Sequence, residues 1–158
     1  MFDTVFGLPV HALVMHAVVV LLPLAALGVV AIAVVPRWRE RFGVLVVLVA
    51  TAGLAAVPVA TRSGGKLEDR IGATGIVERQ INDHQQFGEL VVWPTLAMWV
   101  LAVALVLMDR SRRRGAAVTT VAVLAVLAAI GSAVLVTITG HLGSTAVWSC
   151  TVGSDACR

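Results

Sequence analysis

The sequence predicts an all-α integral membrane protein, a bundle of four membrane-spanning helices. Hydrophobic residues make up 59% of the 158 positions and charged residues only 13%, and the mean hydropathy is +0.95. A water-soluble domain of this size has too small an interior to bury that much apolar surface, so its surroundings must be lipid. Four long apolar runs, each able to cross about 30 Å of hydrocarbon, give the number of spans. We expect a single domain over residues 1–158.

The apolar runs predict membrane-spanning helices at about residues 10–35, 44–60, 88–108 and 116–140. The backbone in lipid must satisfy its own hydrogen bonds, so these runs form helices although they are rich in valine. The alternation of apolar and polar residues that is typical of an outer-membrane barrel is missing. The N-terminus also lacks the basic segment of a cleavable signal peptide, and we expect the first run to be retained as a span.

Arginine-rich connections set the orientation. Segments 36–43 and 109–115 are short and rich in arginine, which places them in the cytoplasm. Both termini, the loop 61–87 and the tail 141–158 are then extracytoplasmic. These two segments hold seven of the 12 Lys and Arg residues of a chain whose formal charge is +3, so the basic balance reflects topology and does not indicate a nucleic-acid partner.

The predicted outer loop 61–87 is too long for a simple linker. It begins with Ser63-Gly64-Gly65, a turn signal. Apolar residues then recur at helical spacing from Thr74 to Phe87, which favours an outward extension of the third span with Thr74 as its N-cap.

The two cysteines lie in the polar tail. Cys150 and Cys157 enclose six residues that include a glycine, which allows their Cα atoms to come within bridging distance. A disulfide persists outside the cytoplasm, so we expect a structural clip. A catalytic or metal-binding thiol pair is the alternative.

All four histidines fall at the ends of apolar segments that meet the outer side of the membrane: His11, His16, His84 and His141. His11 and His16 are five residues apart, about 7.5 Å in rise and roughly 140° in rotation on a helix. They therefore face different directions, and each is expected to meet a partner from another helix. A solvated or capping role at the interface is the plain structural alternative.

Imidazoles that converge from different helices predict a haem or metal site. A haem with two axial histidines also needs small residues where the macrocycle lies against the backbone. Gly140 and Gly143 flank His141, and a small-residue patch around Gly53 lies in the second span. Such residues serve helix packing in lipid as well.

Three motifs resemble a bacterial family of four-helix membrane proteins, domain-of-unknown-function family 2231. They are Gly7-Leu-Pro-Val-His11 with His16 five residues later, Asp83-His84-Gln-Gln-Phe-Gly88, and Gly140-His141-Leu-Gly143. The chain has Ala12 where the family often has proline, and Ser144 where a second glycine is usual. The resemblance covers nearly the whole chain and implies a shared histidine site in the bacterial cytoplasmic membrane, more firmly than it implies a reaction.

The leading functional hypothesis is a b-type haem near the outer leaflet that passes electrons between a membrane donor and an extracytoplasmic acceptor. Its expected axial ligands are His16 with His84 or His141. A bare copper, iron or zinc ion held by three or four of the histidines, with Asp83 or Glu89 beside them, is the first alternative. A structural or assembly subunit is the second.

Other activities fit the sequence less well. No catalytic residue is predicted, because no hydrolase or transferase motif is found. Coupled carriers commonly keep an ionisable residue at mid-span, which these spans lack. The redox partner and the oligomeric state are left open.

Overall fold

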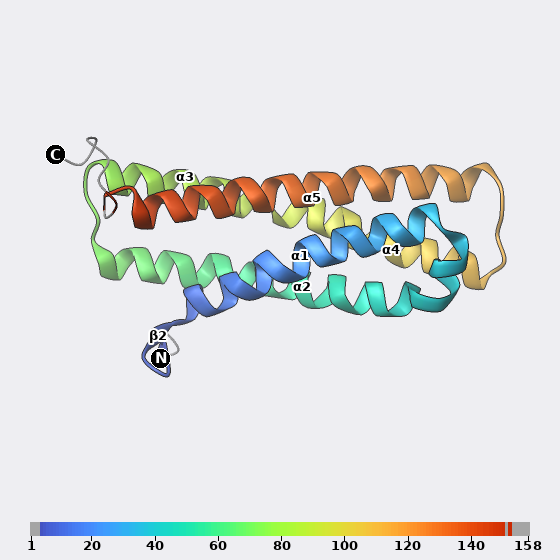
Figure 1. Ribbon diagram of the computed structural model, residues 1–158, viewed down its shortest axis with the longest axis horizontal. Helices are drawn as coiled ribbons and strands as arrows, with labels where there is room; N and C mark the ends of the chain where they lie inside the picture. The colour runs from blue at the N-terminus through green and yellow to red at the C-terminus, as the bar shows by residue number, and fades with distance from the viewer. Residues whose placement is uncertain (1–3, 151, 153–158) are drawn as a thin grey trace.

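The computed structural model describes residues 4–150 and 152, and nearly all of them belong to long helices (Figure 1). Two short strands form a hairpin ahead of the first helix. Four stretches are long and apolar enough to cross a membrane, with α3 and α4 together forming one of them. The elements are β1 (Thr4–Val5), β2 (Leu8–Pro9), α1 (Val10–Val34), α2 (Pro36–Ile71), α3 (Ile76–Leu90), α4 (Val92–Arg110) and α5 (Ala116–Trp148). The predicted fold class is thereby confirmed.

The helices pack as a four-sided bundle. α1 packs against α2 and α5, α4 packs against the same two helices, and α3 continues the line of α4 along α5. The hairpin, the α2–α3 turn and the end of α5 lie at one end of the bundle, and the α1–α2 and α4–α5 connections lie at the other (Figure 1). We call these the histidine end and the arginine end after the residues that each carries.

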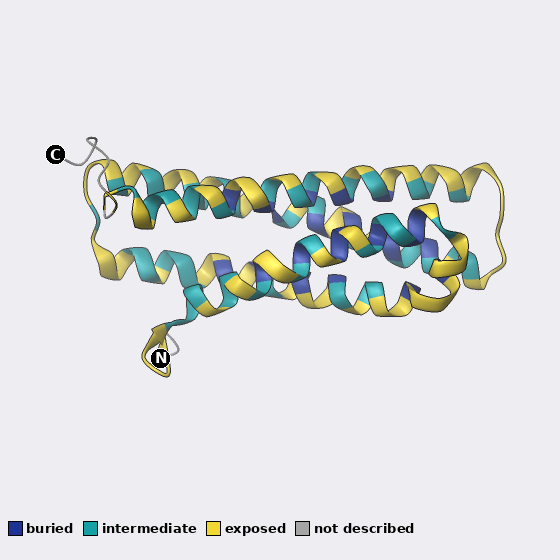
Figure 2. Ribbon diagram, in the orientation of Figure 1, coloured by how far each residue is buried: buried dark blue, intermediate teal, exposed yellow. Residues whose placement is uncertain are grey.

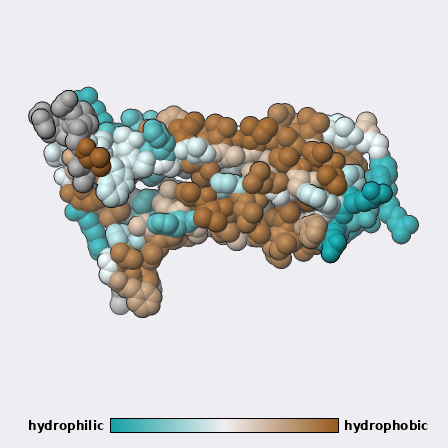
Figure 3. All heavy atoms as spheres, in the orientation of Figure 1, coloured by the Kyte–Doolittle hydropathy of each residue, from teal (hydrophilic) through white to brown (hydrophobic). Residues whose placement is uncertain are grey.

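The core is lined by small residues, and large apolar side chains cover the outside. Alanines of four helices are fully buried beside Leu22, Met98 and Leu105, which allows close helix approach. Thr95 and Ser132 share a buried hydrogen bond of 2.8 Å between α4 and α5. The exposed residues form an apolar belt around the middle of the bundle (Figures 2 and 3). This arrangement suits a lipid environment.

The arginine-rich connection 36–43 is helical, which differs from the expected loop. α1 ends at Val34, and α2 begins one residue later with Pro36 at its first position. Proline is well suited to this place because its fixed φ matches a helix and its missing N–H has no intrahelical role there. The break between the two helices is therefore confined to Val35.

The outer loop 61–87 is also mostly helical. Ser63-Gly64-Gly65 lies inside α2, so the turn predicted there is wrong, and the chain turns at Gly72–Gly75. Gly72 has φ +56° and closes α2 in a left-handed cap. The expected helical extension over 74–87 is present as α3, but its N-cap is Gly75 and not Thr74. Packing of α2 against the start of α1 outweighs the poor helix propensity of the glycine pair.

The tail predicted from residue 141 begins later, because α5 continues to Trp148. At about 1.5 Å per residue, the 36 residues of α2 and the 33 of α5 extend about 50 Å each, well beyond a 30 Å hydrocarbon layer. Both helices therefore project past their apolar runs at the histidine end. The predicted disulfide involves Cys157, which lies outside the described residues.

Arg39 is a charged residue that is buried in the bundle, 5% exposed. Its Nε donates to the carbonyl of Ile32 at 2.9 Å, and its Nη2 donates to the carbonyl of Ala33 at 3.2 Å. These carbonyls belong to the last turn of α1, where no further N–H of the helix follows. The guanidinium also complements the negative end of the helix dipole. Arg39 thus caps α1 from the next helix.

We expect Arg39→Ala to lower the free energy of unfolding by about 2–4 kcal/mol, because two buried carbonyls lose their donors. The measurement is unfolding of the detergent-solubilised protein by heat or by a denaturing detergent. Arg37→Ala is the matched control, since Arg37 is exposed two residues earlier in the same turn. Equal stability of the two variants would contradict the capping role.

Candidate functional site

The first element of the site is His11, in the first turn of α1. Its Nδ1 donates to the carbonyl of Ala60 on α2 at 2.9 Å. The ring lies directly against Gly64, one turn further along α2, where an added Cβ would lie 3.0 Å from the ring carbon Cε1. Because Gly64 has no side chain, the imidazole lies against the α2 backbone.

The second element is His84 on α3, and its setting repeats the first. Its Nδ1 donates to the carbonyl of Thr139 on α5 at 2.8 Å. An added Cβ at Gly143, again four residues after the carbonyl, would lie 2.9 Å from Cε1 of this ring. In each half of the chain, a histidine at the start of one span thus donates to a backbone carbonyl of the returning helix. Its ring also lies against a glycine of that helix. This repeat supports a duplicated helical hairpin.

The two settings bring His11 and His84 together. Their ring centroids are 6.0 Å apart, and the ring planes are nearly perpendicular, at 84°. A carbonyl oxygen can only accept, so each Nδ1 carries a proton. In the neutral imidazole each Nε2 then keeps its lone pair, which is the form in which histidine binds a metal.

Polar contacts between the projecting helices frame this pair. Gln85, next to His84, donates to the carboxylate of Glu68 on α2. Ser149 at the end of α5 donates to Gln80 on α3 at 2.9 Å. These bonds join α3 to both long helices and so fix the position from which His84 reaches His11.

One buried hydroxyl beside the pair lacks a partner. Thr139 is 4% exposed, and its Oγ1 has no hydrogen-bond partner within the described part of the chain, although its carbonyl binds His84. Buried hydroxyl groups are normally satisfied, so this one is available to a water or a bound group.

The other predicted site residues lie apart from the pair. His16 is exposed, and its Nδ1 donates to the carbonyl of Ala12 in its own helix at 2.6 Å. His141 is exposed on α5 and Gly140 has open space beside it. Asp83 and Glu89 are exposed on α3. Over residues 4–150, no three residues among His, Cys, Asp and Glu come close enough to bind one metal ion.

Residues 7–156 match the protein family described as "Predicted membrane protein (DUF2231)". The chain belongs to this family. The match confirms the family expected from the histidine motifs and agrees with a multi-pass membrane location. No curated protein and no solved structure matched the chain. The DUF2231 description names no activity.

Sequence reasoning missed the part played by Gly64 in this DUF2231 protein. Its pairing with Ser63 and Gly65 indicated a turn, whereas the structure uses it as a contact surface for His11. Gly143, the second glycine of the motif Gly140-His141-Leu-Gly143, likewise lies against the ring of His84, a residue distant in sequence. The sequence did contain a signal for these contacts. In both halves of the chain, a histidine precedes one span and a glycine follows the next span.

Proposed function

We propose that this protein is a membrane-bound electron-transfer protein whose b-type haem is held by His11 and His84. The observation that carries the proposal is the pair of imidazoles, 6.0 Å apart, each with Nδ1–H held by a backbone carbonyl. This ligand pair differs from the one expected from sequence, which included His16.

The separation of the rings supports ligation from opposite sides of one metal. Two imidazoles whose Nε2 atoms lie about 2 Å from a common metal have centroids roughly 6 Å apart when they are opposite each other. In a tetrahedral site the centroids are about 5 Å apart by the same reasoning. The observed centroid distance of 6.0 Å is compatible with the opposed arrangement.

The number of histidines points the same way. A haem brings four equatorial nitrogens of its own, so two protein ligands complete its iron. A bare zinc or copper ion takes three or four protein ligands in most sites. The structure joins one histidine from each half of the chain, and this number suits a haem better than a bare ion.

The residues present fit such a group. Gly64 and Gly143 let the two rings lie directly against the backbones of α2 and α5, and the unpartnered hydroxyl of Thr139 offers a polar contact beside His84. The carbonyls of Ala60 and Thr139 fix the tautomer and orientation of the ligands and increase their basicity. A bound haem supplies reversible one-electron chemistry at its iron.

We place the site on the extracytoplasmic side. The arginine end carries both short arginine-rich connections, which favour the cytoplasm, and the histidine end is opposite to it (Figure 1). Electrons then pass between a donor in the membrane and an acceptor outside the cytoplasm. The tail with Cys150 and Cys157 is proposed to lie on the same side and to form a disulfide there.

The test is a visible spectrum of the detergent-purified protein, oxidised and then reduced with dithionite, with metal analysis of the same sample. We expect a Soret band that sharpens on reduction, with resolved α and β bands and one iron for each chain or fewer. Stoichiometric copper, iron or zinc without a haem spectrum would instead support a bare metal site. Absence of both after gentle purification would overturn the proposal and favour a structural subunit.

A further inference from the structure

His16 is an ionisable residue on the lipid-facing side of α1. Exposed apolar residues recur along this helix at helical spacing and form a single stripe. His16 is exposed in the same stripe, with Leu13 before it and Val20 after it. A polar side chain in contact with lipid is costly, and an ionisable residue within a span marks a functional site by default.

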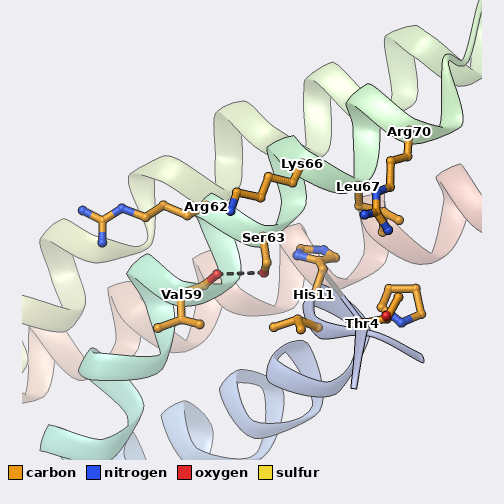
Figure 4. A pocket seen from close by; sticks show the side chains of 10 residues that line it. Thr4, His11, Val59, Arg62, Ser63, Lys66, Leu67 and Arg70 are labelled. Carbon is orange, nitrogen blue, oxygen red and sulfur yellow. Dashed lines mark hydrogen bonds between the residues drawn. The ribbon is translucent and has the colours of Figure 1, made fainter. Parts of the chain in front are cut away.

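The depth of His16 follows from the contacts of its neighbours. The apolar run of α2 ends at Ala60, whose carbonyl accepts the hydrogen bond from His11, and Figure 4 shows the His11 ring against this part of α2. His16 lies five residues further along α1, about 7.5 Å at helical rise. Val18 then belongs to the same buried cluster as Val57 of α2. His16 is therefore inside the apolar layer of the bundle.

The ring of His16 presents an acceptor to the lipid. Its Nδ1 donates to the carbonyl of Ala12 at 2.6 Å. A charged imidazolium is costly in lipid, so the neutral ring, with a lone pair on Nε2, is the expected form. Nε2 is then the nitrogen that can accept from a group outside the helix. Such a group has to be soluble in lipid and carry an O–H or N–H donor.

Pro23 provides a second acceptor on this side of α1. It lies inside the helix and has no N–H, so the carbonyl of Val19 loses the donor that a helix normally gives it. Val19 is 46% exposed, and it follows His16 by three residues, about 4.5 Å at helical rise. Two hydrogen-bond acceptors thus occur within one turn of a lipid-facing surface.

We propose that this surface binds a quinol from the membrane, with one hydroxyl donating to Nε2 of His16 and the apolar tail against Leu13 and Val20. A quinol is soluble in lipid and carries two hydroxyl donors, which match the two acceptors. The inference rests on the proposed electron-transfer function, because it names the chemical class of the membrane donor.

Quinol oxidation uses the same contact. Two O–H bonds break and two C=O bonds form, which releases two protons and two electrons. The electrons pass one at a time to the iron of the proposed haem and then to the extracytoplasmic acceptor. Each hydroxyl proton is taken up at Nε2 of His16, which acts as a general base, and passes from the imidazole to the outer water. His16 and the haem ligand His11 belong to the same helix, which keeps donor and acceptor close.

The experiment follows the imidazole nitrogens by NMR in the full-length protein, with isotope-labelled histidine, in lipid nanodiscs. Dithionite is present, so that the quinol stays reduced. The chain has four histidines, and His16→Leu identifies the signal of His16. Titration with decylubiquinol should shift the Nε2 signal of His16 to saturation. It should leave the signal of His141 unchanged, the matched control, which is also exposed at this end of the bundle. A His16 signal that does not move would overturn the proposal.

Two comparisons show whether the shift reports a specific hydrogen bond. The dimethyl ether of decylubiquinol has the same ring and tail but no O–H, and an equal shift with it would overturn the proposal. Val20→Trp places a bulky side chain one turn from His16 and should weaken quinol binding about 10-fold. Leu27→Trp, on the same stripe further along α1, should leave the affinity unchanged. Equal affinities of the two tryptophan variants would place the quinol elsewhere and overturn the proposal.

The remaining arms separate this site from a dimer contact and from the haem itself. A His16 signal that changes without quinol when a second copy of the chain shares the nanodisc would assign the surface to a dimer and overturn the proposal. His16→Leu should keep the dithionite-reduced haem spectrum but slow haem reduction by decylubiquinol about 100-fold, and an unchanged rate would also overturn it. Saturable quinol binding by a protein without haem would support the quinol site and overturn the electron-transfer function alone.

Discussion

Replacement of either histidine of the pair, His11→Ala or His84→Ala, should abolish the low-spin haem spectrum of the purified protein. In the proposed site His11 and His84, whose ring centroids lie 6.0 Å apart, would together hold the haem iron, one from each half of the chain. Loss of either would leave the iron with a single histidine, and its reduced spectrum would lack the sharp α band of a bis-histidine haem. The measurement is the dithionite-reduced spectrum together with the haem content of each chain.

His16→Ala and His141→Ala are the matched controls. Both residues are exposed, and His16 forms its hydrogen bond within its own helix. Their spectra should match that of the parent protein. If His16→Ala loses the haem and His11→Ala keeps it, the ligand pair proposed from the structure is wrong and the pair expected from sequence is right.

Gly143→Ala should weaken cofactor binding about 10- to 100-fold, the usual effect of disturbing a residue that orients a metal ligand. The added Cβ would lie 2.9 Å from Cε1 and 3.0 Å from Nδ1 of His84. The ring is held by its bond to the Thr139 carbonyl, so it has to break or stretch this bond to make room. Haem titration of the cofactor-free protein, followed by absorbance, measures the effect.

Gly140→Ala separates this effect from the general cost of changing a helical glycine. Gly140 lies in the same helix and has no heavy atom within 4 Å of an added Cβ. Its replacement should leave cofactor affinity unchanged and stabilise α5 by about 0.5–1 kcal/mol, because alanine loses less backbone entropy on folding. Equal affinity of the two alanine variants would show that Gly143 does not position His84.

The spans could be predicted from sequence because lipid imposes a single requirement on them. An apolar run of about 20 residues has to be helical in a membrane, whatever its neighbours. Beyond the ends of the apolar runs, lipid no longer requires a helix, and the structure could not be predicted in this way. The boundaries at Val35, Ile71 and Trp148 depend on packing between helices, which hydropathy does not report.

The end of the bundle at which histidines meet could be predicted from the sequence, but not which of them meet. Histidines at the ends of spans indicated one end of the bundle, and His11 and His84 do meet there. Which imidazoles meet depends on the rotation of each helix and on the short approach to α2 and α5 that Gly64 and Gly143 allow. Neither the rotation of each helix nor the distance between helices can be read from the spacing of residues along the sequence.

The repeated setting of the two histidines has a consequence for assembly. His11 belongs to the hairpin of α1 and α2, and His84 belongs to the hairpin of α3–α4 and α5. A group bound by both imidazoles therefore joins two units whose other contacts are mainly apolar packing. A ligand present at 100 times its dissociation constant adds about 2.7 kcal/mol to the stability of the folded state. Cofactor supply would then govern how much of the protein survives in the cell, because chains that fold without it separate their hairpins more readily and are open to proteolysis.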